Sequence, residues 1–83
     1  MDYELLTQRL GQQIRTRRRH RGLTQQQLAK LANLTRQKII AVEKGSLSVA
    51  IAAYAKALGA MDCELQVITA VMPTLEEVQG MFE

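Results

Sequence analysis

The sequence predicts a mostly α-helical fold of four to five helices, followed by one C-terminal β-strand that pairs across a dimer. Three observations lead to this prediction. Apolar residues recur at helical spacing as far as residue 58, helical segments begin at threonine and end at glycine, and apolar and polar residues alternate only between Cys63 and Thr69. Because 83 residues are too few for two cores, we expect one domain, residues 1–72, and an acidic tail, residues 73–83, that is disordered in the free protein.

The first helix is predicted to end at Arg21, because Gly22 can supply the left-handed residue that follows a helix. Its start is open between Asp2 and Thr7, since either side chain can cap a helix. Its apolar face repeats every four residues: Leu6, Leu10 and Ile14.

Two short helices follow. Thr24 and Gln27 have the spacing of a capping box, and the helix that they open is expected to reach about Ala32. The side chains expected to be buried on it are Leu28, Leu31 and Ala32. Asn33 tolerates a positive φ, and Thr35 can cap a third helix that runs to about Lys44 and stops at Gly45. Two short helices separated by about three residues form the helix-turn-helix pattern.

A fourth helix is predicted from Val49 to Leu58, stopped by Gly59. It is apolar nearly all round, which fits burial by the domain and by a second subunit. Beyond it, the alternation after residue 62 predicts a half-buried strand with a dimer interface of Cys63, Leu65 and Val67. We find no second strand to pair with it, so its partner is expected to be the same strand of another copy. After Pro73, Thr74 and Glu77 have the spacing of a second capping box, which can open a fifth helix.

The basic residues are concentrated in the middle of the chain. The segment from Arg9 to Lys56 holds all eleven Lys and Arg residues and a single acid, Glu43, so its net charge is +10, whereas both ends are acidic. Such a segment attracts a polyanion, or it is a solvated cationic face; charge alone leaves both open. The chain has only three aromatic residues, which argues against a stacking platform for single strands.

Several classes of protein are excluded by the composition. With one cysteine and one histidine, the chain offers neither an internal disulfide nor the usual four-ligand zinc site, and no assembly of catalytic groups is evident. We therefore expect no enzyme activity, no metal and no cofactor. The N-terminus lacks a signal-peptide pattern, and no apolar run approaches the ~20 residues that a membrane span needs. We expect a cytoplasmic protein without a membrane partner.

A resemblance to a known family is carried by residues at matching spacing over about fifty positions. They are Leu10-Gly11, Ile14-Arg15, Arg18, Gly22-Leu23-Thr24-Gln25, Leu28-Ala29, Ala32, Ile39, Val42-Glu43, Gly45 and Ala57-Leu58-Gly59. In these residues the chain resembles the Cro and phage-repressor type helix-turn-helix family. It departs from the family at Asn33, where Gly is usual, at Ile40, where a small polar residue is usual, and in a short loop without Pro before the fourth helix.

The resemblance implies that the third helix enters the major groove of duplex DNA. With Ile39 facing the core, 100° steps place Gln37, Ala41 and Lys44 on the opposite side, flanked by Lys38 and Ile40. We expect Gln37 to bind adenine, Arg36 to bind guanine, and the apolar Ile40 and Ala41 to contact thymine methyls. The expected phosphate contacts are Gln25, Thr35, Lys38 and Lys44.

Arg18 and Glu43 occupy positions that resemble the family's internal ion pair between the first and third helices. Since Glu43 is the only acid in the basic segment, a structural role is favoured over a catalytic one.

These features predict a sequence-specific transcriptional repressor that binds a palindromic operator as a homodimer. The strand after the fourth helix resembles the layout of HipB-type antitoxins, which implies autorepression of a toxin-antitoxin operon and a HipA-like kinase toxin as partner. Two alternatives stay open. One is a protein-interaction module that has lost DNA recognition, favoured by the apolar Ile40. The other is a restriction-modification controller protein, which would dimerise through helices alone.

Overall fold

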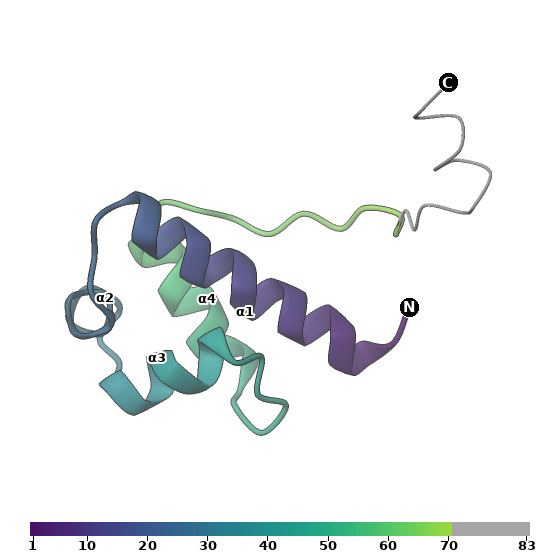
Figure 1. The fold of residues 1–83 in the computed structure, drawn as a ribbon, viewed down its shortest axis with the longest axis horizontal. Helices are drawn as coiled ribbons and strands as arrows, with labels where there is room; N and C mark the ends of the chain where they lie inside the picture. Colours follow the sequence, from purple (N-terminus) through teal and green to yellow (C-terminus); the bar gives the residue numbers. More distant parts are fainter. Residues whose placement is uncertain (71–83) are drawn as a thin grey trace.

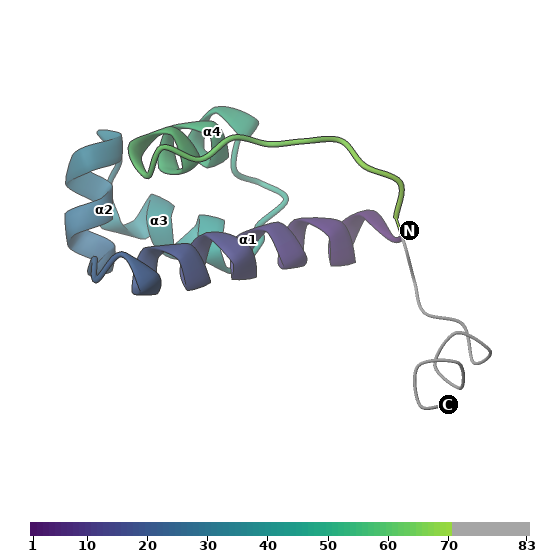
Figure 2. The same ribbon diagram turned by 90° about the horizontal axis from the view of Figure 1, so that it is seen from above.

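The computed structural model describes residues 1–70, which form four helices: α1 (Tyr3–His20), α2 (Gln25–Ala32), α3 (Arg36–Glu43) and α4 (Ile51–Ala60). The mostly α-helical prediction is confirmed for this part of the chain. α2 crosses the C-terminal end of the long α1, and α3 packs against the other three helices (Figures 1 and 2). The predicted acidic tail and its capping box at Thr74 lie outside the described residues.

α1 is capped by Asp2, whose carboxylate accepts a hydrogen bond from the Glu4 amide at 3.2 Å. It ends at His20, one residue before the predicted Arg21, which is the C-cap residue, and Gly22 follows at φ +69°. The predicted apolar face is correct only toward the C-terminal end. Ile14 is buried and Leu10 is half-buried, but Leu6 is 56% exposed. The first turns of α1 extend beyond the core, so Leu6 follows the apolar spacing of the helix but lies where no neighbouring helix packs against it.

The caps predicted for α2 and α3 are confirmed. Thr24 and Gln27 form a reciprocal capping box, and the Thr35 hydroxyl accepts a hydrogen bond from the Lys38 amide. Between the helices Asn33 adopts φ +57°, and the Leu34 amide donates to the Ala29 carbonyl at 2.8 Å. Side-chain and left-handed caps thus satisfy free helix ends on both sides of the turn.

The burial of Leu31 was wrongly predicted, because this side chain is 60% exposed. The buried residues of α2 are Leu28, Ala29 and Ala32, and their centre lies about 107° from Leu31 when residues are placed at 100° steps. α2 therefore presents two alanines to its neighbours, which lets the short helix approach them closely.

One apolar core joins the four helices. Its largest fully buried side chains are Ile14, Leu28, Ile39, Val42 and Met61. α1 approaches the end of α3 closely at Gly11, where an added Cβ would lie 2.5 Å from the Val42 carbonyl oxygen. Gly11 is therefore required for the packing of α1 on α3, and this packing fixes the position of the third helix.

The predicted bounds of α4 are shifted. The helix begins at Ile51, after Ala50 with an extended ψ of 148°, and it continues through Gly59 to Ala60. The left-handed residue is Asp62, at φ +56°, and the Cys63 amide then closes the turn on the Leu58 carbonyl at 2.9 Å. The later stop places Met61 in the core, where it is fully buried.

The predicted strand is absent from the single chain. Residues 63–70 run from the end of α4 back toward the N-terminal end of α1 without forming a strand (Figures 1 and 2). A ladder needs a second strand, and residues 1–70 contain none. Pairing across a dimer accordingly stays a prediction.

Candidate nucleic-acid interface

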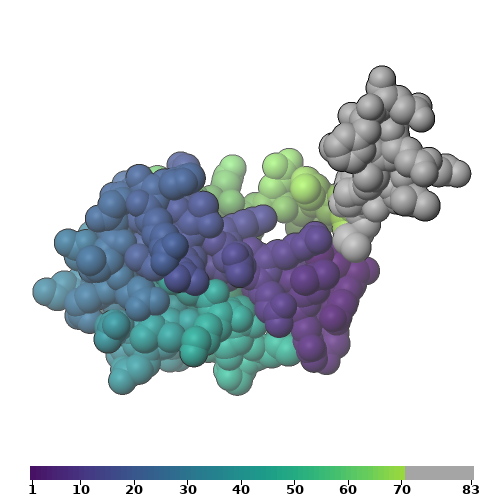
Figure 3. Space-filling view, in the orientation of Figure 1, coloured from purple at the N-terminus to yellow at the C-terminus, as the bar shows by residue number. Residues whose placement is uncertain are grey.

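α3 has one buried side and one side that faces solvent. Ile39 and Val42 are fully buried, and Glu43 is buried at the helix end. The residues that are not buried, here called the recognition face, are Arg36, Gln37, Lys38, Ile40 and Ala41, together with Lys44 directly after the helix. In the space-filling view α3 is open to solvent along the lower edge of the molecule (Figure 3). The helical period therefore predicts the exposure of Gln37, Lys38 and Lys44 correctly, but not that of Ile40 and Ala41, which are half-buried.

The polar and apolar members of the recognition face differ in exposure. Arg36, Gln37, Lys38 and Lys44 are exposed, whereas Ile40 and Ala41 are half-buried. Because α3 packs against three helices, only part of its circumference is accessible to a ligand. The four polar side chains are therefore the most accessible to a ligand, and the half-buried Ile40 and Ala41 are less accessible.

The N-terminal end of α3 can bind negative charge. Thr35 is exposed, its hydroxyl is occupied by the Lys38 amide at 3.2 Å, and its carbonyl accepts from the Ile39 amide. Among residues 1–70, the amides of Arg36 and Gln37 donate no hydrogen bond. Free amides and the helix dipole at this end favour phosphate or base acceptor atoms.

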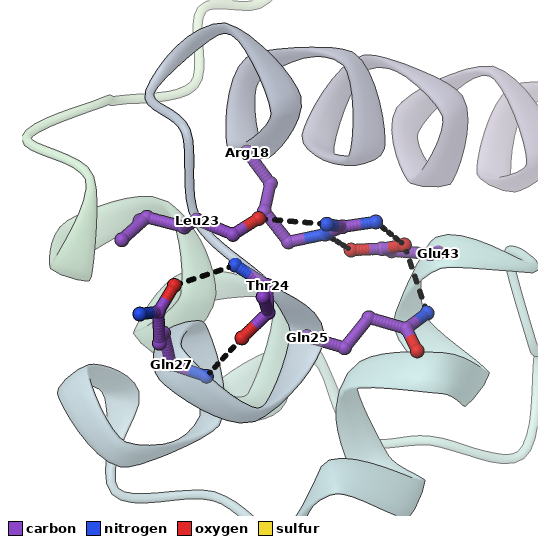
Figure 4. A network of polar contacts seen from close by, with 6 residues as sticks. All are labelled: Arg18, Leu23, Thr24, Gln25, Gln27 and Glu43. Carbon is purple, nitrogen blue, oxygen red and sulfur yellow. Dashed lines mark hydrogen bonds and ion pairs between the residues drawn. The ribbon is translucent and has the colours of Figure 1, made fainter.

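Arg18 and Glu43 form the ion pair that the sequence indicated. Arg18 Nε lies 2.6 Å from Glu43 Oε2, and Arg18 Nη2 lies 3.1 Å from Oε1. The two side chains are only 10% and 4% exposed. Arg18 Nη1 also donates to the Leu23 carbonyl at 2.8 Å (Figure 4). The pair therefore joins α1, the loop before α2 and the end of α3.

Gln25 is not placed as a surface phosphate ligand. Its side chain is half-buried and directed toward α3, and Nε2 donates to Glu43 Oε1 at 3.3 Å (Figure 4). The main-chain amides of Gln25 and Gln26 donate no hydrogen bond within residues 1–70. The start of α2 thus offers backbone amides to an anion, while the Gln25 side chain serves an internal contact.

A polar contact between α1 and the end of α4 is among those that the sequence interpretation missed. Arg21 Nη1 donates to the Met61 carbonyl at 2.7 Å and so holds the C-terminal end of α4 against the end of α1. The two residues are forty positions apart and the acceptor is main-chain, so no local motif could have indicated the contact. The neighbouring Arg15, Arg17, Arg19 and His20 are exposed on α1.

The residues of the predicted dimer interface differ in their surroundings. Cys63 packs partly against the core of its own chain. Leu65 is exposed, and Val67 is 100% exposed. An interface in this segment would accordingly depend on Leu65 and Val67 more than on Cys63.

Metal-binding clusters and membrane-spanning helices are both absent from residues 1–70. No group of three or more His, Cys, Asp and Glu side chains is placed to hold a metal ion. No helix in this part of the chain combines the length and apolarity needed to cross a membrane.

Comparison with known proteins agrees with the geometry. The family described as "Helix-turn-helix domain" matches residues 9–67, more than two thirds of the chain. The match spans α2, the turn and α3, together with the Arg18–Glu43 pair. A search of curated proteins finds no match to this chain. On the family match, supported by the geometry of α2, the turn and α3, the chain belongs to the helix-turn-helix domain family, whose members are DNA-binding regulators.

Proposed function

We propose that this protein is a sequence-specific transcriptional repressor that binds double-stranded DNA as a homodimer on a palindromic operator. The observation that carries the proposal is the recognition face of α3. It presents Arg36, Gln37 and Lys38 to solvent, with Lys44 exposed directly after the helix. In a helix-turn-helix the second helix of the motif, here α3, is the one that enters the major groove. Gln37 has the donor and acceptor that adenine requires, and Arg36 has the fork that guanine requires.

The electrostatics of α3 support this proposal. Glu43 is the only acid on the helix, and its carboxylate is buried against Arg18 instead of facing the ligand. The exposed side of α3 therefore carries positive charge alone. A basic face without acids attracts the phosphate backbone, which supplies the sequence-independent part of the affinity.

The test is to select a duplex from a randomised pool with the wild-type protein and to titrate its binding against salt. A protein that contacts 6–10 phosphates loses about 10³–10⁵ in affinity between 50 and 200 mM salt. We expect one palindromic sequence to be enriched and the salt dependence to be steep. Absence of an enriched sequence, or binding that is insensitive to salt, would refute sequence-specific DNA recognition.

The proposed dimer is joined by residues 63–69 of two copies. The main-chain amides of residues 64–70 donate no hydrogen bond to another main-chain group among the described residues, and Leu65, Val67 and Ile68 are exposed. Two identical strands about a two-fold axis can pair antiparallel and satisfy these groups. Ile51, the first residue of α4, is a further exposed apolar side chain. A rigid ribbon would hold two α3 helices at the ~34 Å spacing of successive major grooves.

Val67→Pro removes one ladder donor and is the direct test of this interface. The control is Val67→Thr, which keeps both the amide and a β-branched side chain. We expect the proline variant to sediment as a monomer and to lose operator affinity, while its helical circular dichroism is unchanged. A Val67→Pro protein that remains dimeric would place the interface on the helices, as in a restriction-modification controller protein.

We further propose that this repressor is the antitoxin of a toxin-antitoxin operon. The sequence of four helices followed directly by an exposed, unpaired segment resembles the layout of HipB-type antitoxins, which supports autorepression of a toxin-antitoxin operon. The partner would then be a HipA-like kinase toxin. The test is whether such a reading frame adjoins this gene and whether its inactive product co-purifies with the protein; neither would be found for a solitary repressor.

The alternative of an interaction module without DNA recognition depends on Ile40. An exposed apolar side chain there would favour a protein ligand, but Ile40 is half-buried and is flanked by exposed Lys38 and Lys44. The DNA selection experiment separates the two functions, because an interaction module would enrich no sequence.

A further inference from the structure

Glu43 is the point at which three helices are joined by polar contacts. Its carboxylate lies at the end of α3 and accepts two hydrogen bonds from Arg18 of α1. A third hydrogen bond comes from Gln25 Nε2, at the first residue of α2 (Figure 4). The bond from Gln25 is the only side-chain hydrogen bond that joins α2 to α3 among the described residues.

The Gln25 side chain is directed toward the carboxylate of Glu43 at the end of α3 (Figure 4). The groups at the start of α2 that can receive a phosphate are the main-chain amides of Gln25 and Gln26, because the Gln27 amide is already bound to the Thr24 hydroxyl at 3.1 Å. These amides remain whatever side chain stands at position 25. The main-chain amide of Gln25 is thus available to an anion, while its side-chain amide makes the contact to Glu43.

The place of this contact connects it to base recognition. α3 has only eight residues, a length of about 12 Å, with Arg36 and Gln37 at one end and Glu43 at the other. Ile39 and Val42 anchor the helix in the apolar core, and the polar contacts at Glu43 connect its C-terminal end to α1 and to the start of α2. Recognition side chains must be held within about 0.5 Å and 10–20° of their productive geometry.

We propose that Gln25 is a positioning residue for DNA recognition: its side-chain amide holds the carboxylate of Glu43 and so sets the angle at which α3 presents Gln37 to base edges. This inference rests on the proposed DNA-binding function. It replaces the expectation that the Gln25 side chain binds phosphate. Loss of the contact therefore reduces discrimination between DNA sequences and leaves backbone affinity in place.

Gln25→Met tests the proposal, because it removes the amide and keeps a side chain of similar length. The matched control is Gln26→Met, since Gln26 is the next residue, is exposed, and makes no side-chain hydrogen bond within residues 1–70. The probes are the duplex selected by the wild-type protein and a scrambled duplex of the same length and composition. Thermal melts confirm that both variants are folded.

For Gln25→Met we expect the ratio of selected to scrambled affinity to fall about tenfold, with the scrambled affinity unchanged. The Gln26→Met ratio stays at the wild-type value. A phosphate contact would instead lower both affinities alike, and an inert contact would change neither; either result overturns the proposal. In the double variant Gln25→Met/Gln37→Ala the two losses are less than additive, because both act through the same base contact.

Amide hydrogen exchange in the free protein provides a readout that does not depend on DNA. We expect the amides near the C-terminal end of α3 to exchange faster in Gln25→Met than in the wild type and in Gln26→Met. Unchanged exchange overturns the positioning role. If the wild-type protein fails to discriminate between the two duplexes, the proposed function is refuted, and the exchange data still decide whether Gln25 holds α3.

Discussion

Replacing Glu43 with glutamine should strongly destabilise the protein, because Glu43 is one partner of a buried ion pair. The substitution keeps the shape of the side chain but removes the negative charge that faces the Arg18 guanidinium at 2.6 Å. Arg18 would keep its hydrogen bond to the Leu23 carbonyl, so a buried cation would be left with a neutral amide and one carbonyl. The change therefore tests whether this pair holds α3 on α1.

The magnitude follows from the burial of the pair. With the two side chains 10% and 4% exposed, removal of one partner is expected to cost about 3–5 kcal/mol, because the other charge stays desolvated. At roughly 0.05–0.15 kcal/mol per residue, a chain of this length has a total stability of about 4–12 kcal/mol. The midpoint of thermal unfolding should accordingly fall by about 12–40 °C.

The assay is urea unfolding followed by far-UV circular dichroism, at one pH and one salt concentration. Glu64→Gln is the control, since Glu64 is exposed and its loss should stay within about 0.5 kcal/mol. The double variant Arg18→Met/Glu43→Leu should be more stable than Glu43→Gln, because it removes both buried charges. If Glu43→Gln cost less than about 1 kcal/mol, the argument from burial would be wrong.

Two further predictions concern the core. Gly11→Ala should lower the free energy of unfolding by about 1–3 kcal/mol, because the added Cβ would lie 2.5 Å from the Val42 carbonyl oxygen. Gly59→Ala should raise it by about 0.4–1 kcal/mol, because its Cβ would meet no atom within 4 Å. Both are measured by urea titration, and equal effects of the two substitutions would contradict this packing. Burial raises the pKa of the Tyr54 hydroxyl, so the unfolded chain ionises first above pH ~10 and stability declines as pH rises further. In Tyr54→Phe this part of the decline in stability at alkaline pH should disappear. The variant should also lose about 1 kcal/mol of stability, because the hydrogen bond to the Ser46 carbonyl is removed. An unchanged dependence of stability on pH would show that Tyr54 does not contribute to the decline.

The helix ends around the turn could be predicted because their chemistry is local. Thr24, Asn33 and Thr35 each satisfy backbone groups within a few residues of themselves, so the sequence contains the whole interaction. The ends of α4 could not be predicted in this way. Gly59 is a good helix stop by itself, but the helix continues past it and places Met61 in the core.

The candidate site shows the same division between local and long-range features. One buried residue, Ile39, and the helical period were enough to predict that Gln37 and Lys38 are exposed on α3, but not that Ile40 and Ala41 are half-buried. The role of Gln25 was not evident, because it depends on the distance between the start of α2 and the end of α3. The exposure of Leu6 and Leu31 likewise depends on which parts of α1 and α2 have a neighbouring helix.

The central claim is that α3 distinguishes DNA sequences through the exposed Gln37, and one comparison tests it most directly. Gln37→Ala and Lys44→Ala are measured against the selected duplex, its single-base variants and the scrambled duplex, over a range of salt concentrations. Gln37→Ala should cost roughly 1–3 kcal/mol on the selected duplex and relax specificity at one base pair in each half-site. Lys44→Ala should weaken binding to all duplexes alike and reduce the salt slope by about one. If Gln37→Ala lowered the affinity for every duplex equally, α3 would not be the helix that recognises the bases.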